Sequence, residues 1–159
     1  MKLVDLVASS AIVPALVSTE RNGAIRELVQ VLAASGGLQA DQVEPVVKSI
    51  IARERSKGTT GFGKGVAAPH AKINGLPRVI AAVGRSATGV DFSSLDGGPV
   101  YGVVLLLSPV EKPEEHLRAM DLVFRVLQKE KFRKFLRQCE TAEAIYELLS
   151  EAEELSVSG

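Results

Sequence analysis

The 159-residue chain has little of several residue types that particular functions require. Its single cysteine, Cys139, excludes an intrachain disulfide and a cysteine-based zinc site. A lone cysteine of this kind is typical of a small buried hydrophobe in a reducing, cytoplasmic protein. The longest strongly apolar run, Val100 to Leu107, is far shorter than the roughly 20 residues that a membrane-spanning helix needs. The sequence therefore predicts a cytoplasmic protein with no stable membrane insertion.

The formal net charge is zero, and aromatic residues are few. Nineteen basic residues balance nineteen acidic ones, so no long-range field would concentrate the chain on nucleic acid or on an anionic membrane. Five Phe, two Tyr and no Trp leave little material for stacking nucleic-acid bases. We expect no nucleic-acid partner, and any anion site must be local.

The remaining composition suits one α/β domain. Hydrophobic residues make up 46% of the chain, which is enough for a core, and neither a repeat nor a linker divides the sequence. Periodicity predicts mixed α/β layers in a single domain over residues 1–159, with an ordered core of about residues 3–150. Helices are expected from a cap at Thr19 to Gly36, from a cap at Asp41 to Lys57, from Pro113 to Leu127, around Phe132 to Leu136, and from a cap at Thr141. Strands are expected at Val66 to Ala68, Val79 to Val83 and Val100 to Leu107.

The most informative segment is the glycine-rich stretch from Gly58 to His70. Gly58 to Lys64 spells most of a P-loop, G-x-x-x-x-G-K, which makes a nucleotide-binding enzyme the alternative function. The match fails at Gly65, where a P-loop needs a Ser or Thr hydroxyl for magnesium and the start of a helix. The sequence that follows, Val66 to Pro69, predicts extended backbone instead.

The same segment offers groups that suit phosphate chemistry. Permissive glycines, backbone N–H groups and the hydroxyls of Thr59 and Thr60 can together hold an oxyanion. Pro69 fixes the backbone before His70, so the imidazole leaves a strand end in a defined direction. A neutral imidazole can accept a phosphoryl group on one nitrogen while a hydrogen bond keeps the proton on the other. An ordinary histidine on a flexible loop is the competing interpretation.

The string Gly-Thr-Thr-Gly-Phe-Gly-Lys-Gly-Val-Ala-Ala-Pro-His resembles the active-site signature of a bacterial protein family. The family is the type-2 IIA domain of the phosphoenolpyruvate-dependent sugar phosphotransferase system, in its fructose, mannitol and nitrogen-regulatory branch. The segment Pro113 to Leu117 is similar to the family's second-histidine segment, and the resemblance extends over roughly residues 3 to 149. It implies a single domain with a mixed β-sheet flanked by helices.

The resemblance also implies a function. His70 would accept a phosphoryl group on Nε2 from an HPr-type phosphocarrier protein, and would pass it to a IIB domain or use it as a regulatory signal. His116 would be the second histidine of the pocket. The physical reading of His116 alone is a solvated residue in the first turn of a helix, where backbone N–H groups favour an incoming anion.

Further phosphate-binding residues follow from the same resemblance and from the chemistry of the loop. Thr59, Thr60 and Gly61 are the candidate loop donors. The family's arginine corresponds to Arg53 or Arg55, and the spacing leaves both possibilities open. No cofactor is expected, and two histidines without a suitable carboxylate or cysteine pattern are a weak metal-ligand set. Phe62 is expected either to contact a partner or to anchor the loop by packing inward.

Overall fold

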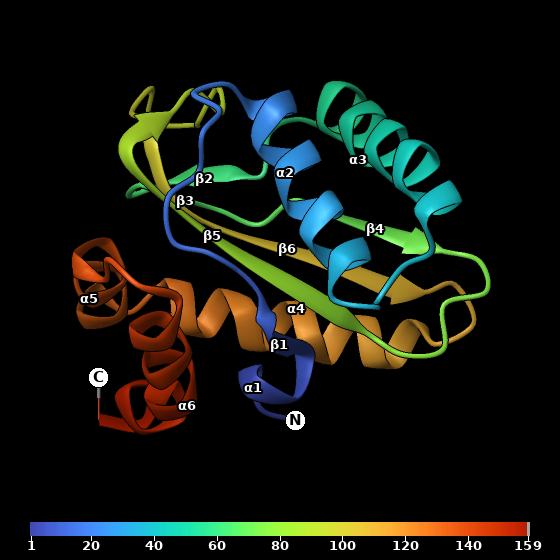
Figure 1. Ribbon diagram of the computed structural model, residues 1–159. Helices are drawn as coiled ribbons and strands as arrows, with labels where there is room; N and C mark the ends of the chain where they lie inside the picture. The colour runs from blue at the N-terminus through green and yellow to red at the C-terminus, as the bar shows by residue number, and fades with distance from the viewer. Residues whose placement is uncertain (159) are drawn as a thin grey trace.

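The computed structural model describes residues 1–158, with side chains placed through residue 152. The helices are α1 (Leu3–Leu6), α2 (Arg21–Ala34), the 3₁₀ turn η1 (Ala40–Gln42), α3 (Val43–Lys57), α4 (Pro113–Leu127), α5 (Glu130–Gln138) and α6 (Ala142–Ser158). The strands are β1 (Val7–Val13), β2 (Gly61–Gly63), β3 (Val66–Ala67), β4 (His70–Ile73), β5 (Ile80–Val90) and β6 (Val100–Pro109) (Figure 1). Within this described part, no helix combines the length and the apolar character needed to cross a bilayer.

All six strands form one mixed sheet in the order β1-β5-β6-β3-β2, and β4 pairs separately with β6. The β1–β5, β3–β6 and β4–β6 pairs are parallel, whereas the β5–β6 and β2–β3 pairs are antiparallel. β3 pairs with residues 102–103 of β6, and β4 pairs with residues 106–109. The two short strands therefore follow each other along one edge of β6, and the chain between them carries Pro69.

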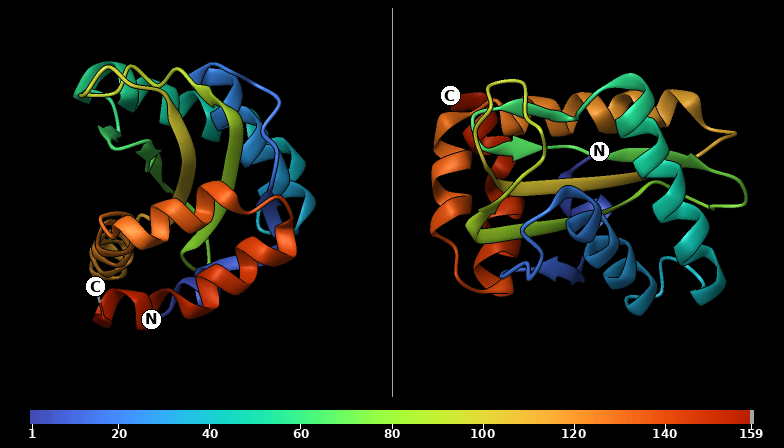
Figure 2. Two further views of the ribbon diagram at one scale, coloured as in Figure 1. Left: turned by 90° about the vertical axis from the view of Figure 1, so that its left-hand side faces the viewer. Right: turned by 90° about the horizontal axis from the view of Figure 1, so that it is seen from above.

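Helices cover both faces of the sheet (Figure 2). Helices α2 and α3 pack on one face, while α1, α4, α5 and α6 pack on the other. Strand β6 supplies both cores alternately: Val104 and Leu106 belong to the α4 side, and Val103, Leu105 and Leu107 belong to the α2 side. Burial on both faces explains why this strand is continuously apolar instead of alternating.

Most of the expected elements are present, including the strands, Pro113 at the first position of α4 and the Thr141 cap. Two expected caps are wrong. The N-cap of α2 is Glu20, whose carbonyl accepts the Ala24 N–H group, whereas the Thr19 carbonyl accepts the Asp91 N–H group. Asp41 lies inside η1, and α3 begins only after it.

Several elements were not expected from the sequence. These are α1, β1, β2 and β4. The last helix also continues past Ser150, and Ala152 is buried in the core at 1% exposure. Cys139 is half-buried against the core on the α4 side, and this burial raises the pKa of its thiol. It is therefore less deeply buried than the sequence suggested.

Candidate functional site

The glycine-rich segment forms a β-hairpin. β2 and β3 are antiparallel, with Gly63 opposite Val66, and the two residues between them, Lys64 and Gly65, have φ angles of 62° and 80°. Two consecutive positive φ angles are typical of the type I′ turn that suits a two-residue hairpin. The Lys64 N–H group donates to Asp96 Oδ2 at 3.0 Å and fixes the turn. A strand follows Lys64 where a P-loop requires a helix, so the structure does not support the P-loop alternative.

His70 is the first residue of β4 and lies opposite Leu106 of β6. The N–H group of Leu106 donates to the Pro69 carbonyl at 3.0 Å, so the backbone before His70 is attached to the central strand. The half-buried imidazole places Nδ1 at 2.9 Å from the carbonyl oxygen of Ala68. Because a carbonyl oxygen only accepts hydrogen bonds, Nδ1 must carry the proton. Nε2 then keeps its lone pair and is the nucleophilic nitrogen.

His116 is the fourth residue of α4, and its backbone N–H group donates to the Lys112 carbonyl at 3.1 Å. Contrary to the solvated reading, His116 is buried at 7% exposure. Its Nδ1 lies 2.7 Å from the hydroxyl oxygen of Ser108, the penultimate residue of β6. Its position in the first turn of the helix is as expected, but the side chain is buried where a solvated one was expected.

Ser108 decides which nitrogen of His116 carries the proton. The serine is fully buried, and within the described residues its hydroxyl has a hydrogen bond only with His116. If Nδ1 of His116 were the donor, the buried hydroxyl hydrogen would have no acceptor, which is costly. The Ser108 hydroxyl therefore donates to Nδ1, and neutral His116 carries its proton on Nε2. His116 can thus donate a hydrogen bond from Nε2.

The two imidazoles are neighbours, with ring centroids 5.6 Å apart and planes inclined by 46°. Burial is the main cause that lowers the pKa of His70, although the Ala68 carbonyl opposes it and the charge of Arg53 adds to it. Burial also lowers the pKa of His116, followed by the positive charges of Lys72 and Arg53. Both rings are therefore neutral at pH 7, as a phosphoryl acceptor and a neutral donor require.

Arg53 and Glu54 form a partly buried pair at the end of α3. The Glu54 carboxylate is fully buried, lies 3.7 Å from Arg53 Nη1 and accepts the Thr60 N–H group at 3.1 Å with each oxygen. The charge of Arg53 lowers the pKa of both imidazoles, whereas Arg55 is exposed and is not among the groups acting on either ring. This electrostatic effect favours Arg53 over Arg55 as the arginine of the candidate site.

Several of the expected phosphate donors are already engaged inside the fold. The Thr59 hydroxyl donates to the Phe92 carbonyl at 2.7 Å and accepts the Gly61 N–H group at 3.0 Å. The Thr60 N–H group is held by Glu54. These hydrogen bonds hold the segment from Thr59 to Gly61 in place, so the Thr59 hydroxyl hydrogen and the Gly61 N–H group are already engaged within the fold. The buried Thr60 hydroxyl has no hydrogen-bond partner among the described residues and remains a candidate.

Residues 6–152 match the family described as "Phosphoenolpyruvate-dependent sugar phosphotransferase system, EIIA 2". The chain belongs to this family. Its role is accordingly that of a phosphocarrier or regulatory component of the phosphotransfer system. The fold is the one expected from the sequence resemblance, a single domain with a mixed sheet flanked by helices.

Individual EIIA 2 relatives are similar over most of this chain. A nitrogen regulatory protein of Bradyrhizobium diazoefficiens is 37% identical over 150 residues, which cover 94% of this chain and 95% of the relative. The fructose-specific EIIABC component of Bacillus subtilis is 33% identical over 95% of this chain, but the chain spans only 23% of that relative's length. The crystal structure of the nitrogen regulatory protein IIA-Ntr from Neisseria meningitidis has a TM-score of 0.80 and 27% identity, covering 91% of this chain and 97% of that one.

Ser108 is a residue of the candidate site that sequence reasoning missed. Its signal was a hydroxyl at the end of an otherwise apolar strand, eight residues before His116. The burial of Glu54 was also missed, although Glu54 follows Ile50 by four residues on the apolar stripe of α3. Phe62 packs partly inward, with its ring centroid 5.1 Å from that of Phe124, whereas Leu117 beside His116 is 68% exposed.

Proposed function

We propose that His70 is the residue of this EIIA 2 chain that is phosphorylated, and that the phosphoryl group is carried on Nε2. The observation that carries the proposal is the hydrogen bond from Nδ1 to the Ala68 carbonyl. It fixes the ring orientation and leaves Nε2 with a lone pair. The lowered pKa of His70 supports the same assignment because protonation would remove that lone pair.

The transfer step is a displacement between two nitrogens. The phosphorus–nitrogen bond of the donor's phosphohistidine breaks while a bond from His70 Nε2 to phosphorus forms, and the donor imidazole recovers its electron pair. His70 keeps its Nδ1 proton throughout because the Ala68 carbonyl continues to accept it. Since little covalent work falls to the protein, catalysis depends on alignment and on holding the charge of the phosphoryl oxygens.

Two side chains are suited to hold this charge. His116 presents a neutral Nε2–H donor from a ring whose centroid is 5.6 Å from that of His70. Arg53 supplies the nearby positive charge, and the buried Glu54 carboxylate positions it. Donors fixed in this way before the reaction begins need no reorganisation during it. We infer that both residues act on the phosphoryl group, and that Glu54 acts through Arg53.

An HPr-type phosphocarrier protein is the proposed donor. A IIB domain is the proposed acceptor, because the name of the similar Bacillus subtilis protein assigns A, B and C parts to one fructose system. Exposed Leu117, directly beside His116, provides apolar surface for docking such partners. The second candidate role is regulatory and is favoured by the similarity to a nitrogen regulatory protein along nearly the whole of both chains.

The assignment is tested by incubating the protein with phosphoenolpyruvate, Enzyme I and HPr. We expect a mass increase of about 80 Da that is lost in acid, as phosphohistidine chemistry requires. The matched control is His70→Gln, which keeps the size and polarity of the side chain but cannot form phosphohistidine. An unmodified wild-type protein would contradict the proposed function, and full labelling of His70→Gln would contradict the residue assignment.

The two downstream roles are separated by what happens to the labelled protein. If it is a transport component, purified phosphoprotein passes its label to a IIB domain within seconds to minutes. If it is a regulator, a target protein binds the unphosphorylated and the phosphorylated forms with different affinities. The phosphoryl label then persists in the presence of IIB.

A further inference from the structure

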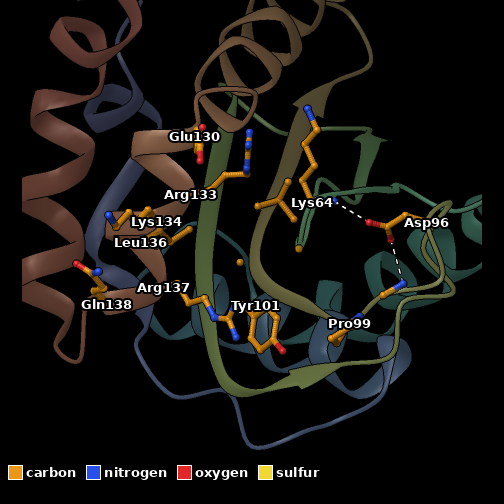
Figure 3. Close-up of a pocket in the computed structure, with 14 residues that line it drawn as sticks. Lys64, Asp96, Pro99, Tyr101, Glu130, Arg133, Lys134, Leu136, Arg137 and Gln138 are labelled. Carbon is orange, nitrogen blue, oxygen red and sulfur yellow. Dashed lines mark hydrogen bonds between the residues drawn. The ribbon is translucent and has the colours of Figure 1, made fainter. Parts of the chain in front are cut away.

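A cavity lies between the hairpin turn and helix α5, and neither His70 nor His116 lines it. Its volume is about 630 Å³, and it is lined by the turn residues Lys64 and Gly65, by the start of β6 and by one side of α5 (Figure 3). This volume is in the range of pockets that hold small organic molecules and exceeds what a single inorganic ion requires. The phosphotransfer step described above uses none of its side chains.

The floor of the cavity is fixed by close backbone contacts. The carbonyl of Gly65 accepts the N–H groups of Tyr101 at 2.8 Å and of Gly102 at 3.1 Å. A Cβ atom at Gly102 would lie 2.6 Å from Leu136 Cδ2, so a larger residue here would displace the buried Leu136 side chain of α5. The cavity is therefore bounded by a hairpin, a central strand and a helix that are held together, and not by a free loop.

The lining carries an excess of positive charge in a chain whose formal net charge is zero. Four lining residues are basic and two are acidic, namely Lys64, Arg133, Lys134 and Arg137 against Asp96 and Glu130. No ion pair within 4.0 Å involves any of these six in the part of the chain with placed side chains. The Asp96 carboxylate is occupied by the N–H groups of Gly98 and Lys64, which lower its pKa. With four basic and two acidic residues, the lining has a formal net charge of +2.

Both arginines of the cavity lining, Arg133 and Arg137, are held in place before any ligand binds. The guanidinium carbon of Arg137 lies 3.6 Å from the ring centroid of Tyr101, and Figure 3 shows the group stacked over that ring. The Arg137 carbonyl also accepts Arg85 Nε at 2.9 Å. Arg133 Nη1 donates to the Leu127 carbonyl at 3.0 Å, which leaves its other N–H groups for a ligand. Stacked and anchored guanidinium groups lose little freedom when they bind an oxyanion.

Lys64, one of the basic lining residues, has a strained backbone conformation. It adopts the left-handed conformation in a turn position where Gly, Asn or Asp is favoured, so a lysine here costs conformational energy. The fold gains no ion pair in return within the described residues. A strained residue that places a charge at the mouth of a cavity indicates a function for that charge.

We propose that this cavity binds a phosphate monoester of a small organic molecule, with the Arg137 guanidinium holding the phosphate and Lys64 adding positive charge elsewhere in the lining. Guanidinium forks match the geometry of phosphate oxygens, and the volume leaves room for the organic part beside Tyr101. The ligand is a sugar phosphate or a nucleoside phosphate, which share this chemistry. The proposal is independent of phosphoryl transfer at His70, because the two sites share no side chain.

The test measures binding to the full-length, unphosphorylated protein by calorimetry and by amide chemical shifts. The probes are glucose 6-phosphate, adenosine 5′-monophosphate, inorganic phosphate and uncharged glucose. All are titrated against the His70→Gln protein as well, so that phosphate bound at the histidine site is recognised. The cavity variants are Arg137→Gln and Lys64→Asn, the latter because Asn suits the left-handed turn. Arg125→Gln, on the outer face of α4, is the matched loss of one charge.

We expect at least one of the two esters to bind, to shift amides near Tyr101, and to bind His70→Gln equally. Arg137→Gln should weaken that binding by about tenfold or more and Lys64→Asn by about threefold, whereas Arg125→Gln should leave it unchanged. The ester preferred identifies the source of the phosphate. Absence of binding of both esters at about 10 mM, equal binding by Arg137→Gln, or loss of all binding in His70→Gln would overturn the proposal. Binding of inorganic phosphate without binding of either ester would overturn the proposal that the ligand is an organic phosphate monoester.

Discussion

His70 and His116 are neighbouring imidazoles, the first half-buried and the second buried, yet the protein gives them opposite proton arrangements. The Nδ1 atom of His70 faces a carbonyl oxygen, which can only accept, so the proton lies on Nδ1. The Nδ1 atom of His116 faces a hydroxyl that must donate, so the proton lies on Nε2. The same side chain is thereby a nucleophile in one position and a hydrogen-bond donor in the other. The difference comes entirely from one hydrogen-bond partner for each ring.

The largest effect is expected from His70→Gln, because the amide has no nucleophilic ring nitrogen. Transfer from phosphorylated HPr should fall below detection, while the melting temperature stays within a few degrees. The measurement is intact-protein mass together with thermal unfolding. Residual labelling above a few per cent of wild type would mean that another residue accepts the phosphoryl group.

His116 should matter less, because it supports charge and accepts no group. Removal of one preorganised donor of this kind typically costs about 10²–10³-fold in rate, so His116→Ala should slow transfer within that range. His116→Gln provides an amide N–H donor and should recover part of the loss. Single-turnover transfer kinetics measure both variants. Equal rates for the wild type and His116→Ala would leave His116 without a role in transfer.

Ser108→Ala changes the proton arrangement of His116 without removing the ring. Leaving the buried Nδ1 unpaired should lower stability by about 1–3 kcal/mol and should mix the two neutral forms of His116. Transfer should slow by about three- to tenfold, which is less than for His116→Ala. The control is Ser86→Ala, another buried serine, whose hydroxyl accepts the Gly89 N–H group. Nitrogen-15 chemical shifts of His116 report the proton position directly. Unchanged shifts in Ser108→Ala would show that Ser108 does not determine which nitrogen of His116 carries the proton.

The smallest expected effect is on pH dependence. Burial lowers the pKa of both rings below the ordinary 6.5, so the folded protein keeps them neutral where the unfolded chain begins to bind protons. Their contribution to stability is complete above pH 6.5 and is lost as the pH falls below it. The acid limb of single-turnover transfer should likewise lie below pH 6.5. Histidine titration followed by NMR checks this, and a midpoint above 6.5 for His70 would contradict it.

The sequence predicted those parts of the fold whose signal is local. β6 and α4 have long, uninterrupted patterns, and Pro113 marks the helix start, so their positions followed from periodicity. β1 was missed because three consecutive residues in its middle, Ala8 to Ser10, are exposed and the pattern does not alternate. β4 was missed because four residues are too few for a periodic signal and their partner, β6, lies far along the chain.

The candidate site was predictable by residue type but not by geometry. The Pro-His end of the glycine-rich segment and its resemblance to EIIA domains made His70 the candidate acceptor, and the similarity of Pro113 to Leu117 to a segment of the same family made His116 the candidate second histidine. Neither indicates that the two rings lie 5.6 Å apart, because 45 positions separate them in the chain (His70 to His116) and tertiary packing brings them together. The glycines were expected to bind phosphate through a loop; the structure shows that Gly63 and Gly65 adopt positive φ angles in a tight hairpin, which the sequence did not predict.

The Ala68 carbonyl has a consequence for how this protein can vary. A backbone oxygen is present whichever amino acid occupies position 68, so no single substitution deletes the partner of His70 Nδ1. The partner of His116 is a side chain, and one nucleotide change in the gene can remove it. The hydrogen bond of His70 Nδ1 therefore keeps its acceptor whatever residue stands at position 68, whereas the hydrogen bond of His116 Nδ1 is lost when Ser108 is replaced by an apolar residue. Among homologues, the strength of phosphate stabilisation should drift more freely than the identity of the phosphorylated nitrogen.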